Sequence, residues 1–199
     1  MSEEGAIPFA DRRVAILTGR SDPARTGLSS AQAAFLAAVC PPGVEPCASG
    51  YPWTPEALPE RPVPLALATW RNSRQWRAAR RDPAFGTALR ARIAVLRQAS
   101  GQLALVTGSC GLDMLAAGWT VSDGPEVLVL ALGPVTSVRP GLPGARVLTV
   151  VGARDILSVL CHRCAADHAV PCGHMGYWTC PETRRAVSGR LAAHFGRLP

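Results

Sequence analysis

The chain has 199 residues, of which 48% are hydrophobic, and its mean hydropathy of +0.13 suits a single domain with a sizeable core. This composition excludes intrinsic disorder, and the apolar runs are too short to span a bilayer. The formal net charge is +7, and all 21 basic residues are arginine, a bias typical of a GC-rich genome. The first residues lack a basic-then-apolar signal pattern, so we expect a cytoplasmic protein without a membrane partner.

Strand and helix patterns alternate along the chain, which predicts one α/β domain over residues 13–199 after an N-terminal tail over residues 1–12. Short apolar runs predict strands over residues 13–19, 44–49, 103–108, 127–132, 147–154 and 168–171. Helices are expected over residues 29–39, 65–98 with a break near Asp82, 157–166 and 182–195, and one after residue 110. We expect a helical, Arg-rich insertion at about residues 52–100. Such alternation predicts a mainly parallel, doubly wound sheet that is covered on both faces.

The segment from Leu103 to Leu115 is the most informative motif, because an apolar strand runs through a turn of small residues into a helix. Thr107 and Gly111 lie two positions before and after Ser109, so the chain can turn sharply there. Such a turn holds a serine oxygen above the edge of the sheet. The pattern is that of the G-x-S-x-G nucleophile elbow, with Thr in the place of the first Gly.

Two later residues complete a candidate constellation. Asp155 ends the apolar run over residues 147–154, and His174 lies in the sequence Gly-His-Met-Gly-Tyr over residues 173–177. A serine hydroxyl becomes a good nucleophile only when an imidazole takes its proton, and that imidazole needs an orienting acceptor. The candidate nucleophile, acid and base therefore occur in that order along the chain, as Ser109, Asp155 and His174.

With these motifs the chain resembles the α/β-hydrolase superfamily from Arg13 onward, in a compact, lid-poor form similar to thioesterases and esterases. The resemblance implies acyl transfer on an ester or thioester by Ser109, with His174 as base and Asp155 as its orienting partner, and no cofactor. It also implies an oxyanion hole of backbone amides, one from Cys110 and one from Arg20 or Ser21. The alternative is a doubly wound domain in which Ser109 and Cys110 make only a tight turn.

Cys110 is also an alternative nucleophile. A thiolate attacks acyl groups better than a hydroxyl, and a helix N-terminus lowers the pKa of a thiol. A thiol enzyme of this fold would be an acyltransferase or cyclase. The spacing favours Ser109, because a turn centred on Cys110 would have Leu112 where a small residue is needed.

A basic stretch in the insertion suggests a partner. Its arginines are spaced by three or four, so several share one face of the expected helix: Arg71, Arg74, Arg77, Arg80 and Arg81. This face is either a solvated surface or a dock for an acidic carrier protein or a phosphate-bearing thioester such as a coenzyme A ester. Nucleic acid is not favoured, because no reading motif is interleaved with the arginines.

Three tryptophans of the same insertion have two interpretations. Trp53, Trp70 and Trp76 either wall an apolar acyl pocket, since no other lid is present, or pack the helices onto the sheet.

Four cysteines near the candidate histidine raise a competing hypothesis. Cys161 and Cys164 form a C-x-x-C motif, and Cys172 and Cys180 follow at either side of His174. Such residues can hold a zinc ion, which would make the chain a zinc-stabilised or non-catalytic binding domain. A helix over residues 157–166 would instead place the first two thiols in the core, so we expect free buried thiols and no metal.

Overall fold

Six parallel strands form one sheet in the computed structural model, which describes residues 7–22, 24–54, 58, 63–120, 126–136, 141–162 and 164–196. The strands are β1 (Ala10–Leu17), β2 (Glu45–Pro46), β3 (Ser100–Gly108), β4 (Val127–Leu132), β5 (Ala145–Gly152) and β6 (His168–Val170). The helices are α1 (Ser30–Val39), α2 (Leu65–Arg81), α3 (Pro83–Gln98), α4 (Gly111–Gly118), α5 (Ile156–Cys161) and α6 (Pro181–Phe195). The strand order is β2-β1-β3-β4-β5-β6, which confirms the predicted doubly wound α/β domain.

The central strands are apolar along nearly their whole length because helices cover both faces of the sheet. All six residues of β4 are buried, as are the last five of β1. The register pairs Leu17 with Thr107 and Gly108 with Leu132, so β1, β3 and β4 end at the same edge. The segments that follow these strands are thereby brought next to one another.

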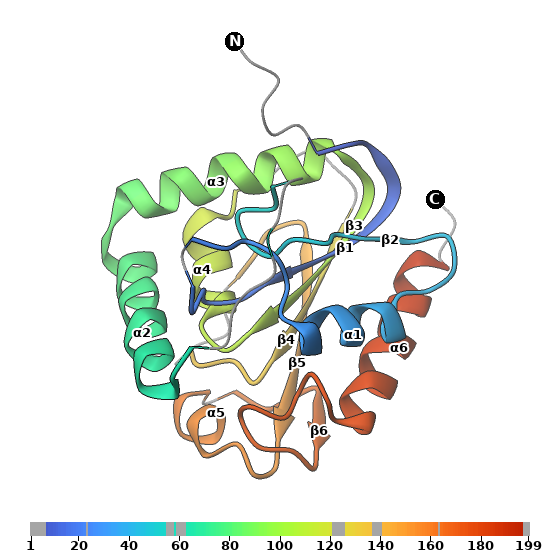
Figure 1. Cartoon of the computed structure of the whole chain (residues 1–199). Helices are drawn as coiled ribbons and strands as arrows, with labels where there is room; N and C mark the ends of the chain where they lie inside the picture. Colours follow the sequence, from blue (N-terminus) through green and yellow to red (C-terminus); the bar gives the residue numbers. More distant parts are fainter. Residues whose placement is uncertain are drawn as a thin grey trace.

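The helices form one layer on each face of the sheet (Figure 1). α1 and α6 pack together on one face, where Phe35 and Leu191 are fully buried in the same apolar cluster. α3 and α4 cover the other face, where Leu89 and Leu112 are fully buried, and α2 packs against α4. None of the described helices combines the length and the apolar character needed to cross a membrane.

The connections change direction between β1 and β3. After β1 the chain passes through α1 to β2 on one side, and then returns through α2 and α3 to β3 on the other side. In parallel sheets a crevice opens at the carboxyl ends of two strands whose connections leave in opposite directions. Any site of this fold is therefore expected where β1 and β3 end.

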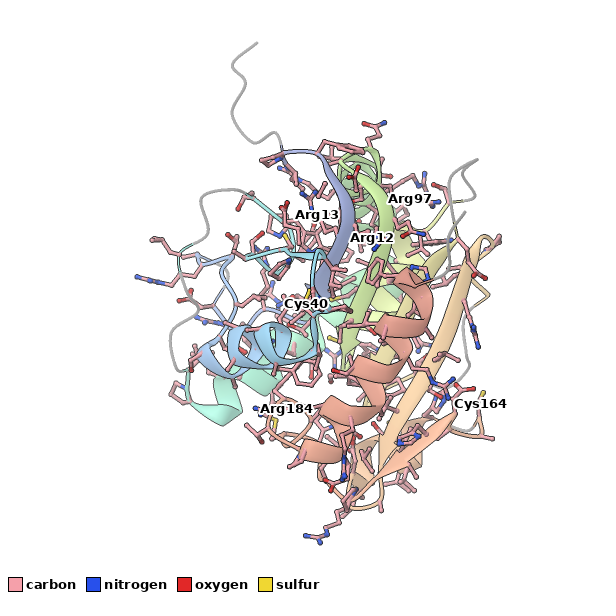
Figure 2. All side chains as sticks on the ribbon, turned by 90° about the vertical axis from the view of Figure 1, so that its right-hand side faces the viewer. Arg12, Arg13, Cys40, Arg97, Cys164 and Arg184 are labelled. Carbon is pink, nitrogen blue, oxygen red and sulfur yellow. The ribbon has the colours of Figure 1, made fainter. Side chains whose placement is uncertain are left out.

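The amino end of β1 holds a fully buried arginine, shown beside that strand in Figure 2. The Arg13 guanidinium donates to the carbonyl oxygens of Ala99 (3.1 Å) and Pro8 (2.6 Å) and to a Glu45 carboxylate oxygen at 2.8 Å. Each of these partners lies on a different segment. Arg13 therefore ties the start of β1 to the turn before β3 and to the edge strand β2.

Several boundaries differ from the prediction, and three of them matter for the argument. β1 already begins at Ala10, so residues 10–12 belong to the sheet and not to a tail. The second strand is much shorter than the predicted 44–49. α5 ends at Cys161, short of the predicted residue 166. The Asp167 carboxylate accepts hydrogen bonds from the Thr149 backbone N–H (2.7 Å) and hydroxyl (3.0 Å), which ties the chain after α5 to β5.

Candidate active site

Ser109 occupies a strained turn between β3 and α4. Its φ of +52° lies in the left-handed region, which non-glycine residues seldom adopt. The backbone is held from both sides, since the Ser109 N–H donates to the Leu132 carbonyl oxygen and the Val135 N–H donates to that of Ser109, both at 3.1 Å. A side chain at Gly111 would place its Cβ 2.2 Å from the Leu17 carbonyl oxygen. The turn thus needs glycine at that position, as the elbow motif predicts.

His174 reaches Ser109 from the loop between β6 and α6. Its Nε2 lies 3.1 Å from the Ser109 Oγ, and its Nδ1 lies 3.0 Å from both carboxylate oxygens of Asp155. With the proton on Nδ1, the imidazole donates to Asp155 and accepts from the Ser109 hydroxyl. The structure therefore brings together the three residues that the sequence singled out as nucleophile, base and acid.

Asp155 is fully buried and is also the N-cap of α5. Its carboxylate accepts hydrogen bonds from the Ser158 backbone N–H (3.0 Å) and the Tyr177 hydroxyl (2.7 Å) in addition to His174. Burial by itself raises the pKa of this carboxyl, but the hydrogen bonds from His174, Ser158 and Tyr177 outweigh it and lower the pKa to about 2. Asp155 is consequently ionised at neutral pH and able to stabilise a protonated His174.

Tyr177 is a site residue to which the sequence analysis assigned no role. Its hydroxyl accepts a hydrogen bond from the Gly152 N–H and donates one to Asp155, both at 2.7 Å. Burial and the bond to Asp155 raise the pKa of Tyr177, so the hydroxyl stays protonated. Gly133, at a φ of +54°, lets this group approach, because a Cβ there would lie 2.4 Å from the Tyr177 ring. Tyr177 belongs to the Gly-His-Met-Gly-Tyr sequence over residues 173–177. Its position three residues after His174 is the feature of the sequence that could have identified it as a site residue.

The loop after β1 is held by α2. The Arg20 N–H donates to the Gln75 Oε1 at 2.8 Å, and the Gln75 Nε2 donates to the Arg20 carbonyl oxygen at 2.7 Å. The Arg71 guanidinium also donates to the Ser21 carbonyl oxygen. The Arg20 amide expected in an oxyanion hole is thus bound to Gln75 in this structure. No sequence motif includes Gln75, so the sequence did not indicate this role.

Cys110 is a poor candidate for the nucleophile in this geometry. Its side chain is 4% exposed, and its φ of −73° is ordinary, so the strained turn position belongs to Ser109. Burial raises the pKa of the Cys110 thiol to about 11. The thiol is therefore protonated near neutral pH, which outweighs the expected effect of the helix N-terminus.

The three tryptophans do not share an open acyl pocket. Trp53 is 1% exposed and donates to the Ile16 carbonyl oxygen at 3.0 Å, so it belongs to the core. Trp76 donates to the Asp113 carboxylate at 2.7 Å and packs between α2 and α4. Trp70 is 55% exposed. Of the two interpretations, Trp53 therefore follows the second, since it packs in the core with its indole N–H satisfied inside the fold.

The arginines of α2 have separate roles. Arg71 binds the loop after β1, and Arg80 lies 3.6 Å from the Asp113 carboxylate and over the ring of Trp76. Arg74, Arg77 and Arg81 are exposed, as is Arg80, and Arg74 stacks on Trp70. Four of the five arginines, all but Arg71, therefore lie on the open surface of α2.

The cysteines near His174 do not form a metal site in the described part of the chain, where no three His, Cys, Asp or Glu side chains are grouped to hold a metal ion. Cys161 is the last residue of α5, and Cys164 lies beyond the helix near the outer edge of the molecule (Figure 2). The two cysteines therefore do not share a helix, contrary to the prediction. Cys172 and Cys180 are buried, and the Cys180 thiol donates to Glu182 at 3.3 Å. Burial raises the pKa of Cys172 to about 11, so this thiol is protonated at neutral pH.

Comparison with known proteins adds no family assignment. No protein-family model matches this chain, and no curated protein matches it either.

Proposed function

We propose that this protein is a serine hydrolase of the α/β-hydrolase type that acts on acyl esters or thioesters. One observation carries the proposal: a continuous relay runs from the Ser109 hydroxyl through His174 to the buried Asp155, with the serine on a positive-φ turn. The order of the strands supports it, because nucleophile, acid and base follow β3, β5 and β6 at one edge of a parallel sheet.

The reaction begins when His174 Nε2 takes the proton of the Ser109 hydroxyl while the oxygen attacks the acyl carbon. The resulting imidazolium lies against the Asp155 carboxylate, which stays ionised. Collapse of the tetrahedral intermediate breaks the bond to the leaving alcohol or thiol, and His174 returns its proton to that group. Water then attacks the acyl-enzyme in the same way, with His174 again as base, and releases a carboxylic acid and free Ser109.

The oxyanion that forms in both steps needs amide donors. The Cys110 N–H is the first, by its position directly after the nucleophile. Gln75 holds the Arg20 amide, so the second donor is either the Ser21 amide or the Arg20 amide after it has exchanged partners.

The acyl group is delivered by a carrier protein or coenzyme A in this proposal. Arg74, Arg77 and Arg81 are exposed arginines of α2 that can contact an acidic partner. Exposed charges of this kind mainly set the rate of association and its salt dependence.

Intact mass spectrometry after treatment with a fluorophosphonate tests the proposal. We expect one adduct on the native chain and on Cys110→Ala, and none on Ser109→Ala. Iodoacetamide under native conditions is the matched probe for a thiol enzyme. Fast alkylation of Cys110 together with loss of ester hydrolysis in Cys110→Ala would reject the serine assignment, and absence of any fluorophosphonate adduct would reject the hydrolase.

A further inference from the structure

Helix α5 has its apolar and polar sides reversed. Four of its six residues are large aliphatic side chains that face solvent, with exposed fractions of 72% for Ile156, 52% for Leu157, 57% for Val159 and 70% for Leu160. Its serine, Ser158, is fully buried. A surface helix ordinarily buries its aliphatic residues and exposes its hydroxyls, so this pattern indicates a surface that binds something.

The four side chains form one face and not a scatter. Successive residues of a helix are rotated by about 100°, so positions 156, 157, 159 and 160 fall within an arc of about 160°. Ser158 points the opposite way, toward β5. None of the six residues of α5 carries a formal charge.

The helix that carries this face starts at the candidate active site. Asp155 is the N-cap of α5, and the helix is about 9 Å long at 1.5 Å per residue. Met175, which is 73% exposed, follows His174. Only two hydrogen bonds, of 3.0 and 3.1 Å, separate Asp155 from the Ser109 oxygen. Figure 1 shows α5 apart from α1 and α6, so neither helix covers it.

The size and neutrality of the face favour an aliphatic chain as its occupant. A stable protein interface buries about 800 Å² on each partner, which is more than four side chains on a six-residue helix supply. An acidic or phosphorylated partner would find no opposite charge on α5. An aliphatic chain needs only a narrow apolar strip that starts beside the reacting carbon.

We propose that the α5 face, formed by Ile156, Leu157, Val159 and Leu160 together with Met175, binds the aliphatic chain of the acyl group that Ser109 attacks. The protein would then prefer medium to long unbranched acyl chains over acetyl. This inference rests on the proposed hydrolase activity and names its substrate class. Trp53 and Trp76, which were expected to line such a site, are engaged inside the fold.

The test compares p-nitrophenyl acetate with p-nitrophenyl decanoate in the native chain and in the double variant Val159→Ser, Leu160→Ser. Both side chains are more than half exposed, so the variant leaves the core intact. Full burial of one methylene changes affinity by about fourfold (~0.8 kcal/mol), and a partly open surface gives less. We therefore expect the decanoate-to-acetate ratio of kcat/KM to fall by about tenfold in the double variant.

Phe9→Ser with Val95→Ser is the matched control. These exposed apolar residues lie near the amino ends of β1 and β3, at the opposite edge of the sheet from Ser109. We expect this control to keep the native ratio. An equal change in both double variants, or an unchanged ratio in the α5 variant, would overturn the proposal.

Binding separates this inference from the proposed reaction. Titration calorimetry of decanoate into Ser109→Ala protein, with and without the α5 substitutions, measures the surface without turnover. At least fivefold weaker binding in the α5 variant supports the proposal even if no ester is hydrolysed, whereas unchanged binding rejects it. Two further results also reject it: a dimer in analytical ultracentrifugation that the α5 variant dissociates, or co-sedimentation with phosphatidylcholine vesicles that the variant abolishes without change in decanoate binding.

Discussion

Replacing Tyr177 with Phe tests how the buried carboxylate of Asp155 is held. The substitution keeps the ring but removes the hydroxyl, which donates to Asp155 and accepts from the Gly152 N–H. One of the three groups that donate to the carboxylate is then lost, and a backbone N–H is left without its acceptor. We expect the pKa of Asp155 to rise in this variant.

The magnitude follows from the structure. Lowering the pKa of Asp155 from 3.8 to about 2 contributes about 2 kcal/mol to the free energy of unfolding at neutral pH. A hydrogen bond to a charged group contributes about 1.5–3 kcal/mol, and an unsatisfied buried N–H costs about 1–3 kcal/mol. We therefore expect Tyr177→Phe to lower the free energy of unfolding by about 2–4 kcal/mol at pH 7.

The stability that Asp155 contributes depends on pH. A carboxyl whose pKa is lowered by folding stabilises the protein above pH 4, and this contribution is lost as the pH falls from about 4 toward 2. The native chain should lose more of this stability than the variant, so the difference between them should shrink over that range.

Urea denaturation at pH 7, 4 and 3 measures both effects. Tyr51→Phe is the matched control, because it removes a tyrosine hydroxyl from another buried ring and keeps that ring's contacts with Trp53 and Phe85. A loss below 0.5 kcal/mol in Tyr177→Phe, which is about what an ordinary surface substitution produces, would refute the reasoning. A large loss that does not change with pH would show that the bond to Asp155 has no part in it.

Three further predictions concern other parts of the structure. Gly133→Ala should lower the thermal midpoint and slow fluorophosphonate labelling, because its Cβ would overlap the ring of Tyr177 and its φ is +54°; a variant that labels at the native rate would contradict this. Arg13→Met should lower the free energy of unfolding by about 2–3 kcal/mol in urea, since three segments lose a shared donor, and a neutral effect would mean that these bonds contribute little. Arg74→Glu combined with Arg77→Glu should reduce turnover of a carrier-bound thioester about tenfold at low salt but much less at high salt, with a small neutral ester as control, and equal rates at low salt would make this face a solvated surface.

The fold was largely predictable from the sequence because its signals are local. A fully buried parallel strand must be apolar throughout, as β4 is, and the break between α2 and α3 coincides with Pro83. The contact that ties the chain after α5 to the sheet was not predictable. Asp167 binds Thr149 on β5, and no periodicity within residues 157–166 contains that contact.

The candidate site was predictable where the turn itself demands particular residues. Ser109 and Gly111 are separated by the spacing that a strained elbow requires, and His174 and Asp155 follow at the ends of later elements. Gln75 was not predictable, because its partner is the backbone of Arg20, and a backbone partner leaves no mark in the sequence of either segment.

The two edge strands have a consequence for association between chains. β2 has two residues and includes Pro46, which has no N–H to offer, and β6 has three residues and is followed by Pro171. An outer strand of two or three residues beside a proline offers only a short row of open backbone groups on which another strand could add. Addition of a strand from a second molecule to β2 or β6 is thereby disfavoured, so these two strands are poor starting points for the growth of a fibre.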